Sequence, residues 1–240
     1  MVPRARLFQA GPATSPSGTT GGPVQCHSVL RVNEIFHSIQ GESTRAGCPC
    51  VFVRLTGCNL RCVWCDTAYA FHEGREMSVE EIIREVERYR CPLVELTGGE
   101  PLLQPEAIPL MGELLRRGQS VLLETGGSLS LEGVPEGVVR IVDVKCPGSG
   151  EAQRNHWANL TLLDGRDELK FVLADREDYV WAARQVRDRG LATRCAVLFS
   201  PVHARLNPAD LARWVLEDGL PVRVQIQLHK ILWPGVERGV

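Results

Sequence analysis

The chain has 240 residues, of which 44% are hydrophobic, and its 27 Lys and Arg residues nearly balance 29 Asp and Glu residues, giving a net charge of −2. This composition excludes a disordered chain and a strongly basic protein that wraps nucleic acid. No apolar run approaches the roughly 20 residues that a membrane-spanning helix needs. The cysteines number nine, an odd count, and no hydrophobic stretch follows the basic residues near the N-terminus. Reduced thiols in the cytoplasm are therefore expected, rather than secreted disulfides.

The first segment is predicted to be a tail. Residues 10–23 are all Ala, Gly, Pro, Ser or Thr, and such a segment cannot bury enough apolar surface to offset the entropy lost on ordering. We expect residues 1–28 to be a flexible tail and residues 29–240 to form one domain.

Strand and helix signals alternate from residue 29 onward. Apolar and β-branched runs predict strands at 29–36 and 50–55, and Ser78 with Glu81 three residues later predicts a capped helix that ends near residue 89. A strand at 93–96 and a helix at 105–117 follow, and then strands at 120–124, 138–144 and 169–173. A helix at 177–189, a strand at 194–199, a helix at 208–217 and a strand at 223–226 complete the pattern. Repeated strand–helix units predict an α/β fold with a mostly parallel sheet, and the length suits a partial (β/α)6 barrel.

Three cysteines fall within eight residues, in the segment Cys58-Asn-Leu-Arg-Cys62-Val-Trp-Cys65. The segment follows a predicted strand, and parallel sheets place their chemistry just beyond the carboxyl ends of strands. A dense group of thiols in a reduced compartment indicates a soft metal. Structural zinc sites and iron–sulfur clusters usually take four protein ligands, so three cysteines would leave one metal position open for a reaction.

Spacing alone leaves two other interpretations open. Cys48 or Cys50 could complete a structural zinc site, which would make the protein a zinc-binding interaction module without catalysis. Cys91 or Cys146 could be the distant fourth ligand of an electron-transfer cluster. Without such a role, Cys48, Cys50 and Cys146 are expected to be small buried hydrophobic residues.

Together with its neighbours, the cysteine trio resembles the radical S-adenosylmethionine (SAM) superfamily. The signature of that superfamily is Cys-x3-Cys-x2-Cys with an aromatic residue, here Trp64, before the last cysteine. The segment 97–101, Thr-Gly-Gly-Glu-Pro, resembles the second motif of the superfamily. Its glycines let backbone carbonyls approach the amino group of SAM, and its glutamate can accept a hydrogen bond from that group. The resemblance implies a partial α/β barrel with a 4Fe-4S cluster on Cys58, Cys62 and Cys65, whose fourth iron is chelated by SAM.

Segments outside the cluster narrow the resemblance to the 7-carboxy-7-deazaguanine synthase family. They are 35–43, 54–59, 65–67 and 225–233, and the similarity runs from about residue 32 to residue 233. It implies a lyase that converts 6-carboxy-5,6,7,8-tetrahydropterin to 7-carboxy-7-deazaguanine and ammonia, on the route to queuosine and other 7-deazapurines. In this family, reductive cleavage of SAM yields a 5′-deoxyadenosyl radical, Mg2+ assists the rearrangement, and SAM is regenerated.

The resemblance assigns the substrate to Ile39, Gln40, Gly41, Glu42, Arg54, Thr97 and His229. A pterin presents an amide-and-amino edge, which Gln40 and Glu42 can meet with acceptors and a donor. The Arg54 guanidinium can hold the substrate carboxylate in a two-pronged hydrogen bond. Taken alone, Glu42 could be a solvated carboxylate, Arg54 part of a structural ion pair, and His229 a structural histidine.

The contacts to SAM are expected from Trp64, Cys65, Asp66, Gly99, Glu100, Lys145 and Ser200, and the strand-end segments 124–126 and 143–145 are expected nearby. Thr67 is expected to offer its hydroxyl to Mg2+, which prefers hard oxygen ligands. Its alternative role is to cap a turn or helix.

Lysine is rare: only Lys145, Lys170 and Lys230 occur among the 27 basic residues. Either codon bias toward arginine explains this, or lysine is retained where a compact ammonium is needed.

The expected partners are the pterin substrate, a one-electron donor such as flavodoxin or ferredoxin, and a second copy of the chain in a homodimer. Near-neutral charge and the absence of a basic run argue against nucleic acid, and no membrane partner is expected. The nearest rival within the superfamily is an enzyme that generates a glycyl radical on a partner protein. Such an enzyme would need a docking groove in place of a closed small-molecule pocket.

Overall fold

The computed structural model describes residues 29–240, so the predicted tail at 1–28 lies outside the described residues. Nine strands form one sheet in the order β3-β1-β2-β4-β5-β6-β7-β8-β9. They are β1 (Val29–Ile39), β2 (Pro49–Leu55), β3 (Arg75–Ser78), β4 (Leu93–Gly98), β5 (Ser120–Thr125), β6 (Val139–Asp143), β7 (Glu168–Leu173), β8 (Ala196–Pro201) and β9 (Arg223–Val224). From β2 to β9 in this order the strands are parallel, whereas β1 is antiparallel to both β2 and β3. The predicted α/β class and mostly parallel sheet are confirmed.

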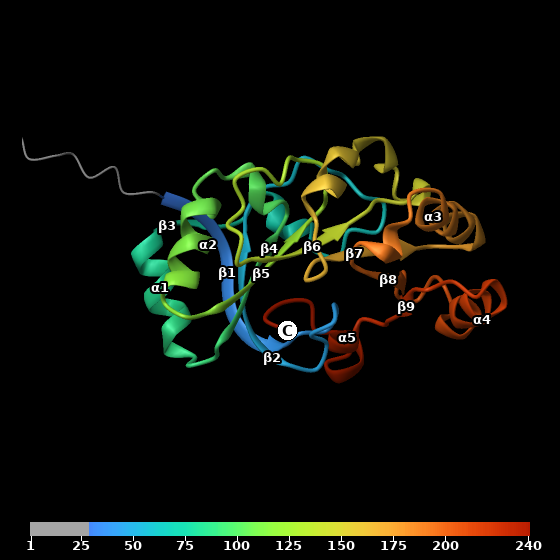
Figure 1. Ribbon diagram of the computed structural model, residues 1–240. Coiled ribbons are helices and arrows are strands. Elements are labelled where there is room, and N and C mark those ends of the chain that lie inside the picture. Colours follow the sequence, from blue (N-terminus) through green and yellow to red (C-terminus); the bar gives the residue numbers. More distant parts are fainter. Residues whose placement is uncertain (1–28) are drawn as a thin grey trace, which may run out of the picture.

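The five α-helices of the described chain are α1 (Val79–Arg88), α2 (Ala107–Arg116), α3 (Arg176–Asp188), α4 (Pro208–Asp218) and α5 (Leu228–Leu232). Short 3-10 helices occur at Ala68–Phe71, Pro101–Leu103, Pro147–Ser149, Ala152–Arg154, Trp157–Leu162 and Leu191–Thr193. In Figure 1, α1 and α2 lie outside the β1–β5 part of the sheet, α3 and α4 lie beyond β7–β9, and the C-terminus lies on the other side, near β2. The predicted capping box at α1 is confirmed: the Glu81 amide donates to Ser78 Oγ at 3.2 Å, and the Ser78 amide donates to Glu81 Oε2 at 2.8 Å.

The regular alternation of strands and helices breaks in the middle of the chain. Within residues 29–240, no α-helix connects β5 to β6, and only 3-10 helices lie between β6 and β7. Glycine and proline recur in both connections, and these residues disfavour a helix interior. The sheet is also open, because β3 and β9 lie at its two edges and do not pair with each other. The expectation of six complete strand–helix units is therefore only partly met.

The core lies between the sheet and its helices. Side chains alternate between the two faces of a strand, so Val51 and Val53 of β2 pack in the core while Arg54 faces the other side with Phe52. Because β2 and β4–β9 are parallel, the loops that follow them gather at one edge of the sheet. The cysteine segment follows β2 and the Gly-Gly segment ends β4, so the fold brings the two motifs together.

Candidate active site

One cavity of about 340 Å3 lies against a single face of the sheet. Phe52 and Arg54 of β2 line it together with Lys170 and Val172 of β7. In the sheet β2 and β7 are separated by β4, β5 and β6, so the sheet curves around the cavity. The predicted site residues that line the cavity are Ile39, Gln40, Gly41, Glu42, Arg54, Cys58, Cys62, Trp64, Cys65, Asp66, Thr67, Thr97, Gly99, Lys145 and His229. Glu100 and Ser200 are buried and are not part of its lining.

The cysteine loop is fixed by backbone hydrogen bonds at several points. The Val63 amide donates to the carbonyl of Ser149 at 3.0 Å, and the Arg61 amide donates to Glu151 Oε1 at 2.6 Å. The Leu60 amide approaches Cys58 Sγ at 3.4 Å. These contacts hold the three half-buried thiols at the cavity wall, between β2 and the chain that follows β6.

The donor set at this wall of the cavity is three thiols, which suit the iron of an iron–sulfur cluster. Burial raises the pKa of the Cys58 thiol, and it raises that of Cys62 to about 11, so bound iron would have to displace their protons. In the part of the chain that the structure describes, no three His, Cys, Asp or Glu side chains converge on one ion position. A 4Fe-4S cluster needs no such convergence, because each cysteine binds a different iron.

The remaining cysteines meet the expectation in part. Cys50 and Cys146 are buried, as expected, whereas Cys48 is exposed, so the prediction that it is buried is wrong. Cys48 ends the loop 40–48, where its carbonyl accepts a hydrogen bond from the Gln40 amide at 2.8 Å, and this loop keeps its side chain at the surface.

The two glycines of the second motif lie against the backbone of the cysteine loop. Gly98 has φ +142°, and a Cβ atom there would lie 2.2 Å from the Leu55 carbonyl oxygen. A Cβ atom on Gly99 would lie 2.1 Å from the carbonyl oxygen of Gly57. Only glycine fits this approach, so the end of β4 and the start of the cysteine loop form one rigid unit.

Glu100 is fully buried, and its carboxylate accepts hydrogen bonds from other groups of the protein. It accepts hydrogen bonds from the Leu102 amide at 3.0 Å, from Thr125 Oγ1 at 2.9 Å and from the Gly126 amide at 2.8 Å. Burial raises its pKa, although these donors oppose the shift. Glu100 therefore joins the ends of β4 and β5, and its expected contact to SAM stays a prediction.

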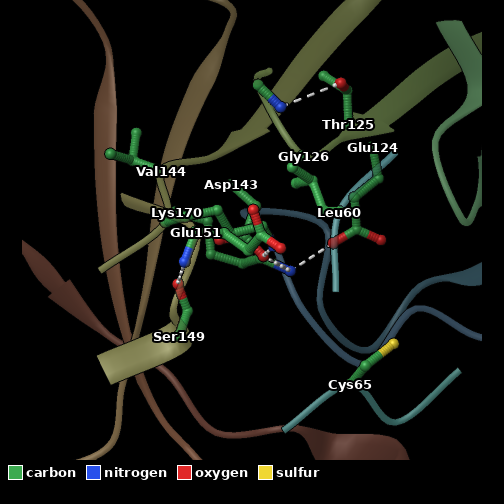
Figure 2. A network of polar contacts seen from close by, with 12 residues as sticks. Leu60, Cys65, Glu124, Thr125, Gly126, Asp143, Val144, Ser149, Glu151 and Lys170 are labelled. Carbon is green, nitrogen blue, oxygen red and sulfur yellow. Dashed lines mark hydrogen bonds and ion pairs between the residues drawn. The ribbon is translucent and has the colours of Figure 1, made fainter. Parts of the chain in front are cut away.

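Lys170 forms the centre of a buried polar network at the other end of the cavity. Its Nζ lies 2.6 Å from Glu42 Oε2, forms an ion pair with Glu124 and lies 3.9 Å from Asp143 Oδ2. Figure 2 shows Lys170 with Glu124 and Asp143, while Cys65 lies apart from them on the cysteine loop. Asp143 in turn binds Lys145 Nζ at 2.9 Å. All three lysines of the chain line this cavity, which supports retention of lysine for a compact ammonium.

Arg54 is held through its Nε, and within residues 29–240 the other nitrogens of its guanidinium make no hydrogen bond. Its Nε donates to Glu34 Oε1 at 2.8 Å, and the Tyr69 hydroxyl donates to the same oxygen at 2.9 Å. The guanidinium carbon lies 5.6 Å from the centre of the Phe36 ring and 5.9 Å from that of Tyr69. Arg54 therefore both forms an ion pair with Glu34 and lines the cavity.

The C-terminal segment covers the same end of the cavity. Gln227 Nε2 donates to Glu42 Oε1 at 2.8 Å, and Lys230 Nζ binds Asp66 Oδ2 at 2.9 Å. His229 packs on Gly41 so closely that a Cβ atom there would lie 2.1 Å from His229 Nδ1. Burial lowers the pKa of His229, which keeps its imidazole neutral at neutral pH.

Sequence reasoning missed Lys170, Glu95 and Gln227 as parts of the site. Glu95 is buried on β4 and accepts a hydrogen bond from the Gln40 amide group. Gln227 belongs to the C-terminal motif but was given no role. The scarcity of lysine was the available signal for Lys170, because it lies on β7 between two core residues, Leu169 and Phe171.

Comparison with known proteins identifies the family. The sequence profile of the Radical SAM superfamily matches residues 52–215, more than half of the chain. A 7-carboxy-7-deazaguanine synthase of Koribacter versatilis is 48% identical over 226 residues, which cover 88% of this chain and 100% of that protein. The chain belongs to the 7-carboxy-7-deazaguanine synthase family. A synthase of the same name from Chlorobaculum tepidum is 47% identical, and the match covers 88% of this chain and 97% of that protein.

The fold of the synthase family is also seen among solved structures. The crystal structure of QueE from Escherichia coli matches with a TM-score of 0.68 at 23% identity, covering 85% of this chain and 96% of that one. At this level of identity the match supports the fold alone. Membership of the synthase family replaces the three alternatives drawn from the sequence, which were the zinc-binding module, the electron-transfer cluster and the glycyl-radical-generating enzyme.

Proposed function

We propose that the protein converts 6-carboxy-5,6,7,8-tetrahydropterin to 7-carboxy-7-deazaguanine with loss of ammonia, as a SAM- and 4Fe-4S-dependent lyase of 7-deazapurine biosynthesis. The observation that carries the proposal is the full-length similarity to synthases of that name, at 47–48% identity. The cavity supports it, because the cysteine trio lines the same space as a group of carboxylates and Arg54. A cofactor that generates a radical and a polar small molecule could therefore meet in it.

The SAM end is assigned to residues that lie around the cysteine loop. Cys58, Cys62 and Cys65 would hold the cluster, and the backbone at Gly99, with Trp64, Asp66 and Lys145, would hold SAM. When bound, the cluster and SAM would supply a carbon radical that removes a hydrogen atom from the substrate. The buried Glu100 supports this end by fixing the Gly126 backbone, and the buried Ser200 stays a predicted contact.

The substrate end is assigned to Ile39, Gln40, Gly41, Glu42, Arg54, Thr97 and His229. Glu42 and the nearby Glu124 offer carboxylate acceptors to the N–H groups of a pterin. The free edge of the Arg54 guanidinium can bind the substrate carboxylate. The neutral imidazole of His229 closes the space beside Gly41. Protein groups thus surround the substrate and reduce its contact with water, which protects a radical from side reactions.

The proposal also includes Mg2+ as a cofactor, with Thr67 as its protein ligand. Thr67 lines the cavity, and its Oγ1 lies 3.8 Å from Cys65 Sγ. The Thr67 side chain caps no helix: it makes no capping hydrogen bond to the 3-10 helix that follows it. A Thr67→Ala variant should lose most of the stimulation of turnover by Mg2+ while it retains its iron content. Full magnesium-dependent activity in this variant would show that Thr67 is not a ligand of Mg2+.

The remaining partners belong to the proposal as well. A one-electron donor such as flavodoxin or ferredoxin would reduce the cluster, and the protein would act as a homodimer in the cytoplasm. Residues 29–240 contain no helix long and apolar enough to cross a membrane. Analytical ultracentrifugation of the reconstituted protein tests the dimer, and a monomer at micromolar concentration would refute it.

Anaerobic reconstitution tests the function directly. The protein with reductant, SAM, Mg2+ and 6-carboxytetrahydropterin should yield 7-carboxy-7-deazaguanine, identified by mass. A Cys62→Ser variant should lose the broad iron–sulfur absorbance near 400 nm and all turnover, whereas Cys48→Ser should retain both, because Cys48 is exposed and outside the cavity lining. Loss of metal in Cys48→Ser would instead support the alternative in which Cys48 completes a structural zinc site.

A further inference from the structure

Lys170 is a buried cation to which no sequence motif assigns a role. It is only 4% exposed, on the central part of β7. Its ammonium contacts Glu42 from the loop after β1 and Glu124 from the end of β5, which are 128 and 46 residues away in the chain. A buried ammonium thus binds two carboxylates from separate elements and links the loop after β1 and the end of β5 to β7.

The two carboxylates are fixed at both oxygens. Lys170 binds Oε2 of Glu42, while Oε1 of Glu42 accepts from Gln227 at 2.8 Å. Lys170 binds Oε1 of Glu124, while Oε2 of Glu124 accepts from Thr97 Oγ1 at 3.2 Å. Both glutamates line the cavity. Each carboxylate oxygen can accept more than one hydrogen bond, so both keep acceptor capacity toward a ligand.

The strand that carries Lys170 also holds the loop of Glu42 at a second point. Glu168, two residues earlier on β7, accepts hydrogen bonds from the Thr44 amide at 3.0 Å and from Thr44 Oγ1 at 2.5 Å. Residues two apart on a strand face the same side. The loop 40–48 is therefore attached to β7 at Glu42 and at Thr44, and it forms one wall of the cavity.

We propose that Lys170 is a positioning residue of the substrate end, whose ammonium holds Glu42 and Glu124 as a pair of ionised acceptors directed at the N–H donors of a bound pterin. The inference rests on the proposed function and adds to it the residue that organises recognition of the substrate. Lys170 acts through the two glutamates and needs no contact with the substrate.

The charge states support this role. Burial opposes ionisation of Glu124, but the adjacent Lys170 outweighs it and lowers the pKa of Glu124 to about 2. The neighbouring Glu95 shows the opposite case: burial, and then the Glu124 charge, raise its pKa well above the usual range. The ammonium thus favours the ionised form of Glu124, with which it forms an ion pair, whereas the pKa of Glu95, with which it forms none, stays raised by burial.

The test compares Lys170→Met and Lys170→Arg with the wild-type enzyme. Lys170→Met should raise the KM for the pterin by about tenfold or more, the scale of a lost charge-assisted hydrogen bond, and leave the KM for SAM within about twofold. Arg184→Met is the matched control, because it breaks an exposed ion pair with Asp188 on α3; its kinetics should equal those of the wild type. Lys170→Arg keeps the charge and should recover part of the loss.

A pH profile separates positioning from mere stability. Without the ammonium, the pKa of Glu124 should rise because burial is no longer opposed, so the pterin KM of Lys170→Met should fall as the pH rises from 7 to 9, while that of the wild type stays level. The other charged or titratable groups around Lys170 and its two partners are Arg54, Asp66, Glu95, Asp143, Lys145 and His229. His229 is already neutral in this range because burial lowers its pKa.

If Lys170→Met does not fold, Lys170→Met with Glu124→Gln removes the excess buried charge and is compared with Glu124→Gln alone. A positioning role predicts that the lysine substitution raises the pterin KM less on this background than in the wild type, since one of its two targets is already lost. Equal pterin KM values and level pH profiles for the wild type and the lysine variants would refute the proposal. A wild-type enzyme that leaves the pterin unchanged would instead refute the proposed function.

Discussion

The contact between Gly41 and His229 gives a prediction whose size follows from the structure. A Cβ atom on Gly41 would lie 2.1 Å from His229 Nδ1, whereas an ordinary Cβ contact begins at 3.4 Å, so the imidazole must move by at least 3.4 − 2.1 = 1.3 Å. Displacing a substrate-positioning group by about 1 Å costs on the order of 100-fold in rate, equivalent to about 2.7 kcal/mol. Gly41→Ala should therefore lower kcat/KM for the pterin by roughly 100-fold.

The assay measures turnover of the pterin at saturating SAM, with two further variants. Gly112→Ala on α2 meets nothing within 4 Å; it should leave the kinetics unchanged and raise the free energy of unfolding by up to about 1 kcal/mol. Gly41→Ala combined with His229→Ala removes the clash and should be no worse than His229→Ala alone. Wild-type kinetics in Gly41→Ala would refute this prediction, because the close packing of His229 on Gly41 would then have no effect on turnover of the pterin.

Three further predictions concern stability. Ser78→Ala removes the capping box of α1 and should lower the free energy of unfolding by about 1 kcal/mol in urea titrations, and no change would contradict the cap geometry. Lys170 outweighs burial and lowers the pKa of Glu124 to about 2 from its ordinary 4.5. Between these two pH values the unfolded chain binds more protons than the folded chain. The stability that the Lys170–Glu124 pair contributes is therefore complete above about pH 4.5 and is lost as the pH falls toward 2. Thermal unfolding of Glu124→Gln should show a flatter pH dependence in that window, and an unchanged slope would contradict the pairing. Tyr179→Phe removes a buried hydroxyl that lies 2.8 Å from the Trp214 carbonyl and should cost about 1 kcal/mol, whereas a more stable variant would contradict this contact.

Local signals in the sequence predicted most of the secondary structure. The capped start of α1 at Ser78 and the apolar runs of β2, β4 and β7 each depend on a few neighbouring residues, and each was confirmed. The strand β3 (Arg75–Ser78) was missed because its four residues, Arg-Glu-Met-Ser, contain a single apolar side chain and no β-branched residue. It forms through pairing with β1, which is a tertiary effect.

The site was predictable only where residues lie close together in the chain. The cysteine trio and the Gly-Gly motif were found because each occupies a few consecutive positions. Lys170 was not, since its partners Glu42 and Glu124 lie in other elements and its own neighbours are apolar. For Glu100 the motif predicted a contact with SAM, but not the donors from β5 and the chain beyond it that already satisfy its carboxylate.

The ratio of pterin converted to SAM cleaved tests most directly whether the enzyme contracts the pterin ring with SAM as a regenerated cofactor. The assay quantifies 7-carboxy-7-deazaguanine and 5′-deoxyadenosine in one anaerobic reaction of the reconstituted enzyme with 6-carboxytetrahydropterin, reductant and Mg2+. We expect the ring-contracted acid together with ammonia, in clear excess over 5′-deoxyadenosine, because SAM would be regenerated in each turnover. Release of 5′-deoxyadenosine with the pterin unchanged would contradict it.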